Sequence, residues 1–155
     1  MAHYMAELVL TDRPVLVIGG GAVARRKING LLSTGARLTV AAPELDPRLL
    51  EQAAAGRFHH RAESYHPALL DAVPRWALVF AATGENGLNR EIALQAKEAG
   101  LLCNSADGVE VGGFLVPAMV RRGPVAVGVA TEGNSPALSR LLKERLDAWL
   151  EPGWG

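Results

Sequence analysis

Residues 14–24 read PVLVIGGGAVA, a short apolar run that meets three glycines and continues into small residues. An unbroken apolar run of this length is typical of a strand buried on both faces of a parallel sheet. Residues 22–34 then repeat apolar side chains at helical spacing, and Gly35 follows as a stop signal. This part of the chain therefore predicts a strand, a glycine turn and a helix, the opening units of a parallel α/β sheet.

The same alternation continues over the next seventy or so residues. It predicts further helices at 47–55 and 87–99, and further strands at 37–42, 58–62, 76–82 and 101–104. Crossovers of ten or more residues between successive strands are what a parallel sheet requires. We therefore predict an α/β fold with a Rossmann-type doubly wound parallel sheet over residues 1–107.

The pattern changes beyond this region. Residues 114–120 and 124–131 are two extended runs separated by Arg121-Arg122-Gly123, a spacing that predicts a β-hairpin. A helix is then predicted from Ser135 as N-cap, with a wide apolar face made by Leu138, Leu141, Leu142, Leu146, Trp149 and Leu150. Such a face requires a partner surface, so residues 108–155 are predicted to form a separate segment.

Composition limits the kinds of partner. The 155 residues suit one domain with a small appendage, and 16 basic residues balance 16 acidic ones. This balance gives no reason to expect nucleic acid or a membrane surface, and no uncharged apolar run reaches the roughly 18 residues of a membrane span. The chain has one cysteine, and residues 1–13 contain no apolar signal core, so we predict a cytoplasmic protein. No Cys/His spacing resembles a zinc site, so no metal site is predicted.

The glycine turn carries the clearest chemical signal. Residues 19–24 fit the pattern G-x-G-x-x-A and lie directly after a predicted strand. Gly19 allows the tight turn and Gly21 lets the backbone approach a pyrophosphate, which the helix N-terminus attracts. The turn therefore predicts dinucleotide binding, although a glycine turn that serves packing alone remains an alternative.

The ribose half of this fingerprint is incomplete. A carboxylate is expected at the end of the second strand, but the strand at 37–42 is followed by Pro43 and then by Glu44. The ribose contact therefore falls to the backbone or to Glu44. No arginine stands at the strand end either, which favours NAD over NADP.

Polar residues also follow the later strands. Thr83 and Gly84 come after the strand at 76–82, on the edge where such sheets bind ligands, so we predict that they contact the cofactor. Asp107 follows the fifth strand and is the best-placed carboxylate for proton chemistry beside a hydride transfer. Plain turns remain the alternative at both places. The loop 131–136 leads into a helix N-terminus and suits an anion, although capping alone also explains Ser135.

Five motifs in this order resemble the precorrin-2 dehydrogenase / sirohydrochlorin ferrochelatase family, the NAD-dependent module at the N-terminal end of siroheme synthases. They are VIGGGAVARRK (17–27), AAT (81–83), CNSAD (103–107), FLVPAMVRRGPV (114–125) and GNSPALSRLLKE (133–144). The resemblance covers nearly the whole chain. It implies oxidation of precorrin-2 to sirohydrochlorin, with NAD as hydride acceptor, on the route to siroheme or cobalamin.

Together with the patterns described above, the resemblance predicts roles for individual residues. Asp107 would be the acid/base group. The cofactor would be bound by Gly19, Gly21, Ala22, Val23, Pro43, Glu44, Thr83 and Gly84. The tetrapyrrole would be bound by Asn104, Thr131, Gly133 and Ser135. Residues 108–155 would build a homodimer, and a uroporphyrinogen-III methyltransferase would act upstream.

The chain departs from the family at its C-terminus. Relatives usually continue into a small helical domain that helps cover the tetrapyrrole, whereas this chain stops at Gly155. The leading expectation is therefore a dehydrogenase. Two alternatives stand beside it: a bifunctional enzyme that also inserts Fe²⁺ into sirohydrochlorin, and a non-catalytic NAD-sensing domain. Such sensors usually keep an acidic residue at the end of the second strand, which this chain lacks.

Overall fold

The computed structural model of the chain describes residues 3–85, 87–108 and 111–150. The chain divides into two compact units. The larger unit is Ala6–Phe114, and the smaller one joins the start of the chain to the part from Leu115 onward. None of the described helices is long and apolar enough to cross a membrane.

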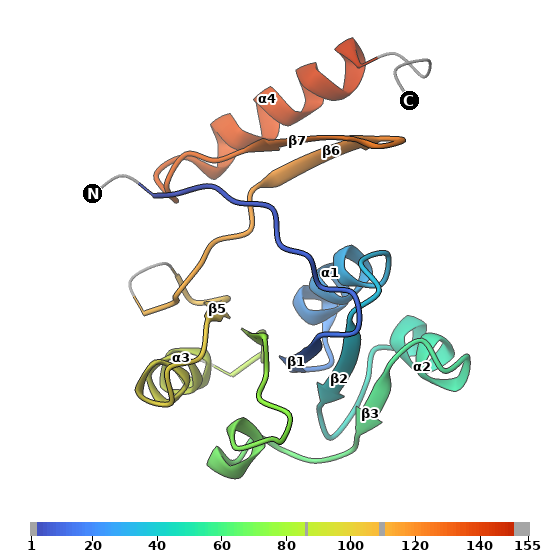
Figure 1. Ribbon diagram of the computed structural model, residues 1–155, viewed down its shortest axis with the longest axis vertical. Helices are drawn as coiled ribbons and strands as arrows, with labels where there is room; N and C mark the ends of the chain where they lie inside the picture. The colour runs from blue at the N-terminus through green and yellow to red at the C-terminus, as the bar shows by residue number, and fades with distance from the viewer. Residues whose placement is uncertain (1–2, 86, 109–110, 151–155) are drawn as a thin grey trace. The chain divides into compact units, whose positions relative to one another are not determined.

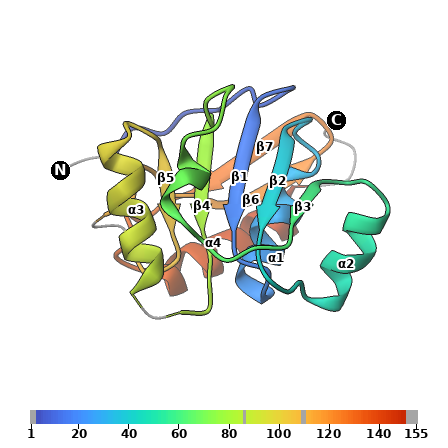
Figure 2. The same ribbon diagram turned by 90° about the horizontal axis from the view of Figure 1, so that it is seen from below.

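The larger unit is built on a five-stranded sheet in the order β3-β2-β1-β4-β5, in which every pairing is parallel. Figure 2 shows β1 in the middle, with β2 and β3 on one side and β4 and β5 on the other. The strands are β1 (Pro14–Ile18), β2 (Arg37–Ala41), β3 (His59–Arg61), β4 (Leu78–Ala81) and β5 (Cys103–Ser105). The predicted doubly wound parallel sheet is confirmed.

Helices cover both faces of this sheet with their apolar sides. Helices α1 (Ala22–Leu31) and α2 (Pro47–Ala54) pack on the face that carries Val15 and Val17. Helix α3 (Leu88–Glu98) and the 3₁₀ helix η1 (Pro67–Leu70) pack on the opposite face. All the apolar residues of β1 between 15 and 18 are at most 1% exposed, which explains why this strand reads as a continuous apolar run.

Helix η1 is an element that the sequence pattern did not predict. Its Leu69 and Leu70 are buried, and the carbonyl oxygen of Leu69 accepts a hydrogen bond of 2.7 Å from Trp76 Nε1. Trp76 therefore closes the loop before β4 instead of starting the strand, which begins at Leu78. Four residues give too little periodicity for detection from sequence.

The smaller unit contains an antiparallel hairpin and a helix (Figure 1). Strand β6 (Ala118–Arg122) pairs with β7 (Val125–Val129), and α4 spans Pro136–Trp149. The hairpin was predicted, but its turn was placed too early. Arg122 pairs with Val125, so only Gly123 and Pro124 remain for the turn, and Gly123 supplies the positive φ of 52°.

Candidate functional site

The carboxyl ends of β2, β1, β4 and β5 meet along one edge of the sheet. The ladder continues past the strands there: Gly19 N–H donates to Ala41 O (2.9 Å), Ala82 N–H to Ile18 O (2.8 Å) and Ala106 N–H to Ala81 O (2.9 Å). The strand order changes direction between β1 and β4. Open α/β sheets bind their ligands at this switch point, so a binding site is expected at this edge.

The glycines of the turn have different roles. Gly19 has a φ of +121°, and a Cβ on it would lie 2.2 Å from Ala82 O. A Cβ on Gly20 would lie 2.1 Å from Glu44 O. At Gly21, by contrast, no heavy atom lies within 4 Å of the Cβ position. The first two glycines are therefore required by packing, whereas Gly21 borders open space.

Helix α1 begins at this open turn. Its N-cap, Gly21, is extended and offers no side chain to the first N–H groups of the helix. Ala22 and Val23, the first two helical residues, are exposed. The free N–H groups and the positive end of the helix dipole are therefore available to an anion.

The segment after β2 packs against the glycine turn. Asp46 N–H donates to Gly20 O (2.8 Å), and Pro43 and Glu44 are exposed beside it. The Asp46 carboxylate also receives the Arg25 Nη1 hydrogen bond at 3.0 Å. Arg25, a cation of α1, is thus already paired with this loop.

A buried amide joins the ends of β4 and β5. Asn89 Oδ1 accepts from Thr83 N (2.8 Å) and from Thr83 Oγ1 (2.9 Å). Its Nδ2 donates to Thr83 O (3.2 Å) and to Asp107 Oδ1 (2.8 Å). Asn89 is 2% exposed, whereas Gly84 and Asp107 are exposed. The structure therefore brings the predicted Thr83 and Asp107 together through a residue that the prediction missed.

A sequence signal for Asn89 does exist. The buried residues of α3 are Asn89, Ile92, Ala93 and Ala96, which follow the spacing of one helix face. An amide on this otherwise apolar stripe needs hydrogen-bond partners inside the protein. Such a residue is a marker of a buried polar network.

Asn104 takes part in a second network, on the face covered by α1. Its Oδ1 accepts a hydrogen bond from Lys27 Nζ, and its Nδ2 donates to Phe114 O (3.0 Å). Lys27 also lies 5.5 Å from the centroid of the Phe80 ring. Burial, with a smaller contribution from Arg26, lowers the pKa of Lys27 below its ordinary value. Lys27 therefore lies partly buried against the sheet, although it belongs to a run of three basic residues on α1.

Thr131, Gly133 and Ser135 belong to the smaller unit. Thr131 Oγ1 contacts Ser135 O (3.1 Å) and Ser139 Oγ (2.9 Å). Ser135 Oγ accepts from Leu138 N (3.3 Å) and caps α4. Gly133 has a positive φ of 81°. The hydrogen bonds of this loop stabilise the start of α4, and the predicted contact with substrate stays a prediction.

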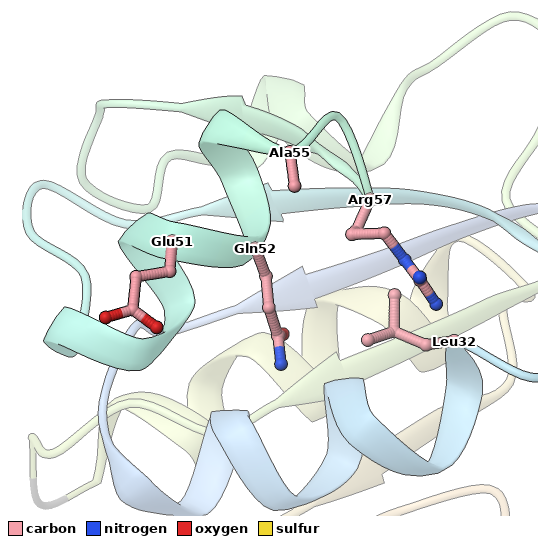
Figure 3. A pocket seen from close by; sticks show the side chains of 5 residues that line it. All are labelled: Leu32, Glu51, Gln52, Ala55 and Arg57. Atoms are coloured by element: carbon pink, nitrogen blue, oxygen red, sulfur yellow. The ribbon is translucent and has the colours of Figure 1, made fainter.

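A hollow of about 350 Å³ lies elsewhere, between the C-terminal parts of α1 and α2 (Figure 3). It is lined by Leu32, Glu51, Gln52, Ala55 and Arg57. None of the predicted site residues lines it. Because α1 runs away from the carboxyl edge of the sheet, this hollow is separate from the site described above. The described residues contain no group of three or more His, Cys, Asp or Glu arranged to hold a metal ion.

Comparisons with known proteins show which family has this fold and this glycine turn. The family model described as "Putative NAD(P)-binding" matches residues 7–118. The chain belongs to this NAD(P)-binding family. It is also 30% identical to a solved structure named SirC, precorrin-2 dehydrogenase, with a TM-score of 0.83 over 97% of this chain and 72% of that one. The resemblance predicted from the five motifs is confirmed.

Curated relatives of this NAD(P)-binding module are longer proteins. The siroheme synthase of Methylobacillus flagellatus is 39% identical over 146 residues, which are 94% of this chain and 31% of that protein. The siroheme synthase of Chromobacterium violaceum is 40% identical over 155 residues, which are 100% of this chain and 32% of that protein. The chain thus spans about a third of the length of these relatives.

The turn fits the cofactor that defines the NAD(P)-binding family. The position that a Cβ on Gly21 would occupy is open space. It lies at the start of α1, where no side chain caps the helix. A diphosphate in this space would meet backbone N–H donors and the positive end of a helix dipole. The glycine turn is therefore an adequate cradle for the phosphates of NAD.

Proposed function

We propose that the chain is the NAD-dependent dehydrogenase module that oxidises precorrin-2 to sirohydrochlorin in siroheme biosynthesis. The observation that carries this proposal is the exposed Asp107 carboxylate, held by Asn89 at the edge that also contains the open Gly21 turn. A base is thereby fixed beside a dinucleotide cradle. The similarity to a precorrin-2 dehydrogenase over 97% of the chain supports the same reaction.

The reaction removes two electrons and two hydrogens from precorrin-2, so that precorrin-2 and NAD give sirohydrochlorin, NADH and a proton. NAD, when bound, supplies the acceptor for the hydride. Asp107 takes the proton on its second oxygen, because Oδ1 already accepts from Asn89. An exposed carboxylate then passes this proton to water without further machinery.

The cofactor is proposed to lie along the carboxyl edge of the sheet. Its diphosphate meets Gly19, Gly21 and the N–H groups of Ala22 and Val23. Its ribose lies beside Pro43 and Glu44, and its nicotinamide half approaches Thr83 and Gly84. The Glu44 carboxylate repels a 2′-phosphate, and Arg25 is paired with Asp46 and so does not attract one. Both features support NAD over NADP.

We also propose that the smaller unit forms a homodimer. None of the 14 residues of α4 is buried, and Leu138, Leu141 and Leu142 are between 37% and 46% exposed. An exposed leucine stripe of this kind is typical of an interface. The part of the predicted segment 108–155 that the structure describes supplies this stripe. A methyltransferase that delivers precorrin-2 and a cytoplasmic location stay predictions.

Substituting the stripe is expected to separate the dimer. Leu141→Glu removes about 2 kcal/mol of apolar burial in each subunit and adds a charge to the interface. The dissociation constant should rise roughly 100-fold or more, as measured by light scattering on a size-exclusion column. Lys143→Ala is the matched control, because it changes the net charge by the same amount on the other side of α4. A dimer that survives Leu141→Glu would place the interface elsewhere.

Separate titrations distinguish an enzyme from a sensor. We expect calorimetry to show that the protein binds NAD and, independently, sirohydrochlorin. A domain that only senses the dinucleotide ignores the tetrapyrrole. Binding of NAD together with complete indifference to sirohydrochlorin would overturn the proposed function in favour of the sensor.

A further inference from the structure

Asn89 is the one polar residue on the buried stripe of α3. Burying an amide costs about 1–3 kcal/mol when its hydrogen bonds are not replaced. At this position a leucine would extend the apolar stripe made by Ile92, Ala93 and Ala96. The amide is therefore explained by its partners and not by helix packing.

Its hydrogen-bonding capacity is completely used. A carboxamide oxygen accepts two hydrogen bonds and its nitrogen donates two, and Asn89 makes all four. The partners also fix its orientation, because Thr83 N–H requires an oxygen and the Asp107 carboxylate requires a donor. All four bonds go to Thr83 and Asp107, six and eighteen residues away.

These two partners flank the proposed reaction site. Thr83 follows β4, where the cofactor is proposed to lie, and Asp107 follows β5. The ladder between β4 and β5 ends with the hydrogen bond from Ala106 N–H to Ala81 O, so it stops before either partner. Beyond it, Asn89 links the two segments through side-chain bonds on both sides.

We propose that Asn89 is the positioning residue that fixes the Asp107 carboxylate relative to the cofactor crevice. It binds one carboxylate oxygen, which leaves the other directed to the substrate, and it holds the Thr83 turn with its remaining bonds. This inference rests on the proposed function. It adds that a buried amide holds the base beside the cofactor crevice, together with the hydrogen bond from Asp107 N–H to Ser105 Oγ (3.2 Å).

The link has two arms, the bonds of Asn89 to Thr83 and its bond to Asp107. Two substitutions affect these arms differently. Asn89→Asp keeps an oxygen for Thr83 N–H and Oγ1. It replaces the nitrogen that donates to Asp107 and, over a longer 3.2 Å bond, to Thr83 O by an oxygen that repels the Asp107 carboxylate. Asn89→Ala removes both arms. Gln95→Ala is the matched control, because it deletes another amide of α3 whose bonds go to Tyr65 and Glu91.

The expected results differ between rate and cofactor affinity. Asn89→Asp should lower kcat roughly 10- to 100-fold with the dissociation constant for NAD changed less than about twofold. Asn89→Ala should also weaken NAD binding, by about tenfold, in calorimetry on the protein without substrate. Gln95→Ala should change neither quantity. A loss of kcat and NAD affinity that follows thermal stability in all three variants would overturn the proposal.

A double substitution shows whether Asn89 acts through Asp107. In the Asp107→Asn background, Asn89→Asp should change kcat less than about twofold, because the group that it positions has lost its basicity. An equal loss of kcat in both backgrounds would overturn the positioning role. Full turnover by Asp107→Asn alone would instead overturn the proposed base, while the NAD affinity of Asn89→Ala would still decide the Thr83 arm.

Discussion

Replacing Asp107 with asparagine is expected to lower kcat for precorrin-2 oxidation by about 10²- to 10⁴-fold. Asparagine has nearly the same shape, and its Oδ1 can still accept the hydrogen bond that Asn89 Nδ2 donates to Asp107. It does not take up a proton. The loss should therefore fall on kcat, with NAD affinity and thermal stability close to those of the parent protein. Anaerobic turnover followed by NADH absorbance measures it.

Glu85→Gln provides the control for this substitution. Glu85 is exposed and follows β4 at the same edge of the sheet. Its replacement by glutamine removes one negative charge, as Asp107→Asn does. Its side chain has no bond to Asn89 among those that hold the described site. The control variant should keep turnover within about twofold. If Asp107→Asn turned over as fast as Glu85→Gln, Asp107 would not be the base.

Gly19→Ala should destabilise the larger unit by about 3 kcal/mol or more. The new Cβ would lie 2.2 Å from Ala82 O, in the backbone of the neighbouring segment, and alanine would have to adopt a φ of +121°. Neither strain is relieved by moving a flexible side chain. Urea unfolding monitored by circular dichroism should show a much lower midpoint, or the variant should fail to accumulate as folded protein.

Gly21→Ala is the matched substitution with the opposite outcome. Gly21 has a φ of −87°, and its Cβ position is free of neighbours within 4 Å, so stability should change by less than about 1 kcal/mol. The added methyl group would occupy the proposed diphosphate site and weaken NAD binding. Equal stability of the two variants would contradict this division between a packing glycine and a binding glycine.

The local patterns explain why much of the fold was predictable. The strand at 14–18 is buried on both faces, so its sequence is apolar throughout, and the glycines mark the turn that a parallel sheet needs. The position of Asp107 was predicted in the same way, because the carboxyl ends of parallel strands lie along one edge of the sheet. The hairpin turn was misplaced because Arg121 and Arg122 look like loop residues but belong to β6 and pair with β7.

The parts that were missed depend on contacts between distant residues. The ammonium group of Lys27 reaches Asn104, seventy-seven positions away, on the face of the sheet covered by α1. Asn89 lies within the helix predicted at 87–99, and its hydrogen-bond partners, Thr83 and Asp107, follow β4 and β5. A single sequence shows that a polar residue falls on a buried stripe, but not which groups satisfy it.

Anaerobic turnover of precorrin-2 tests the central proposal most directly. With NAD and the purified chain, we expect NADH and sirohydrochlorin to form in equal amounts, at a rate proportional to protein concentration and strongly reduced by Asp107→Asn. Titration showing bound NAD and bound tetrapyrrole, but oxidation no faster than the spontaneous reaction, would contradict the assignment of this chain as the dehydrogenase.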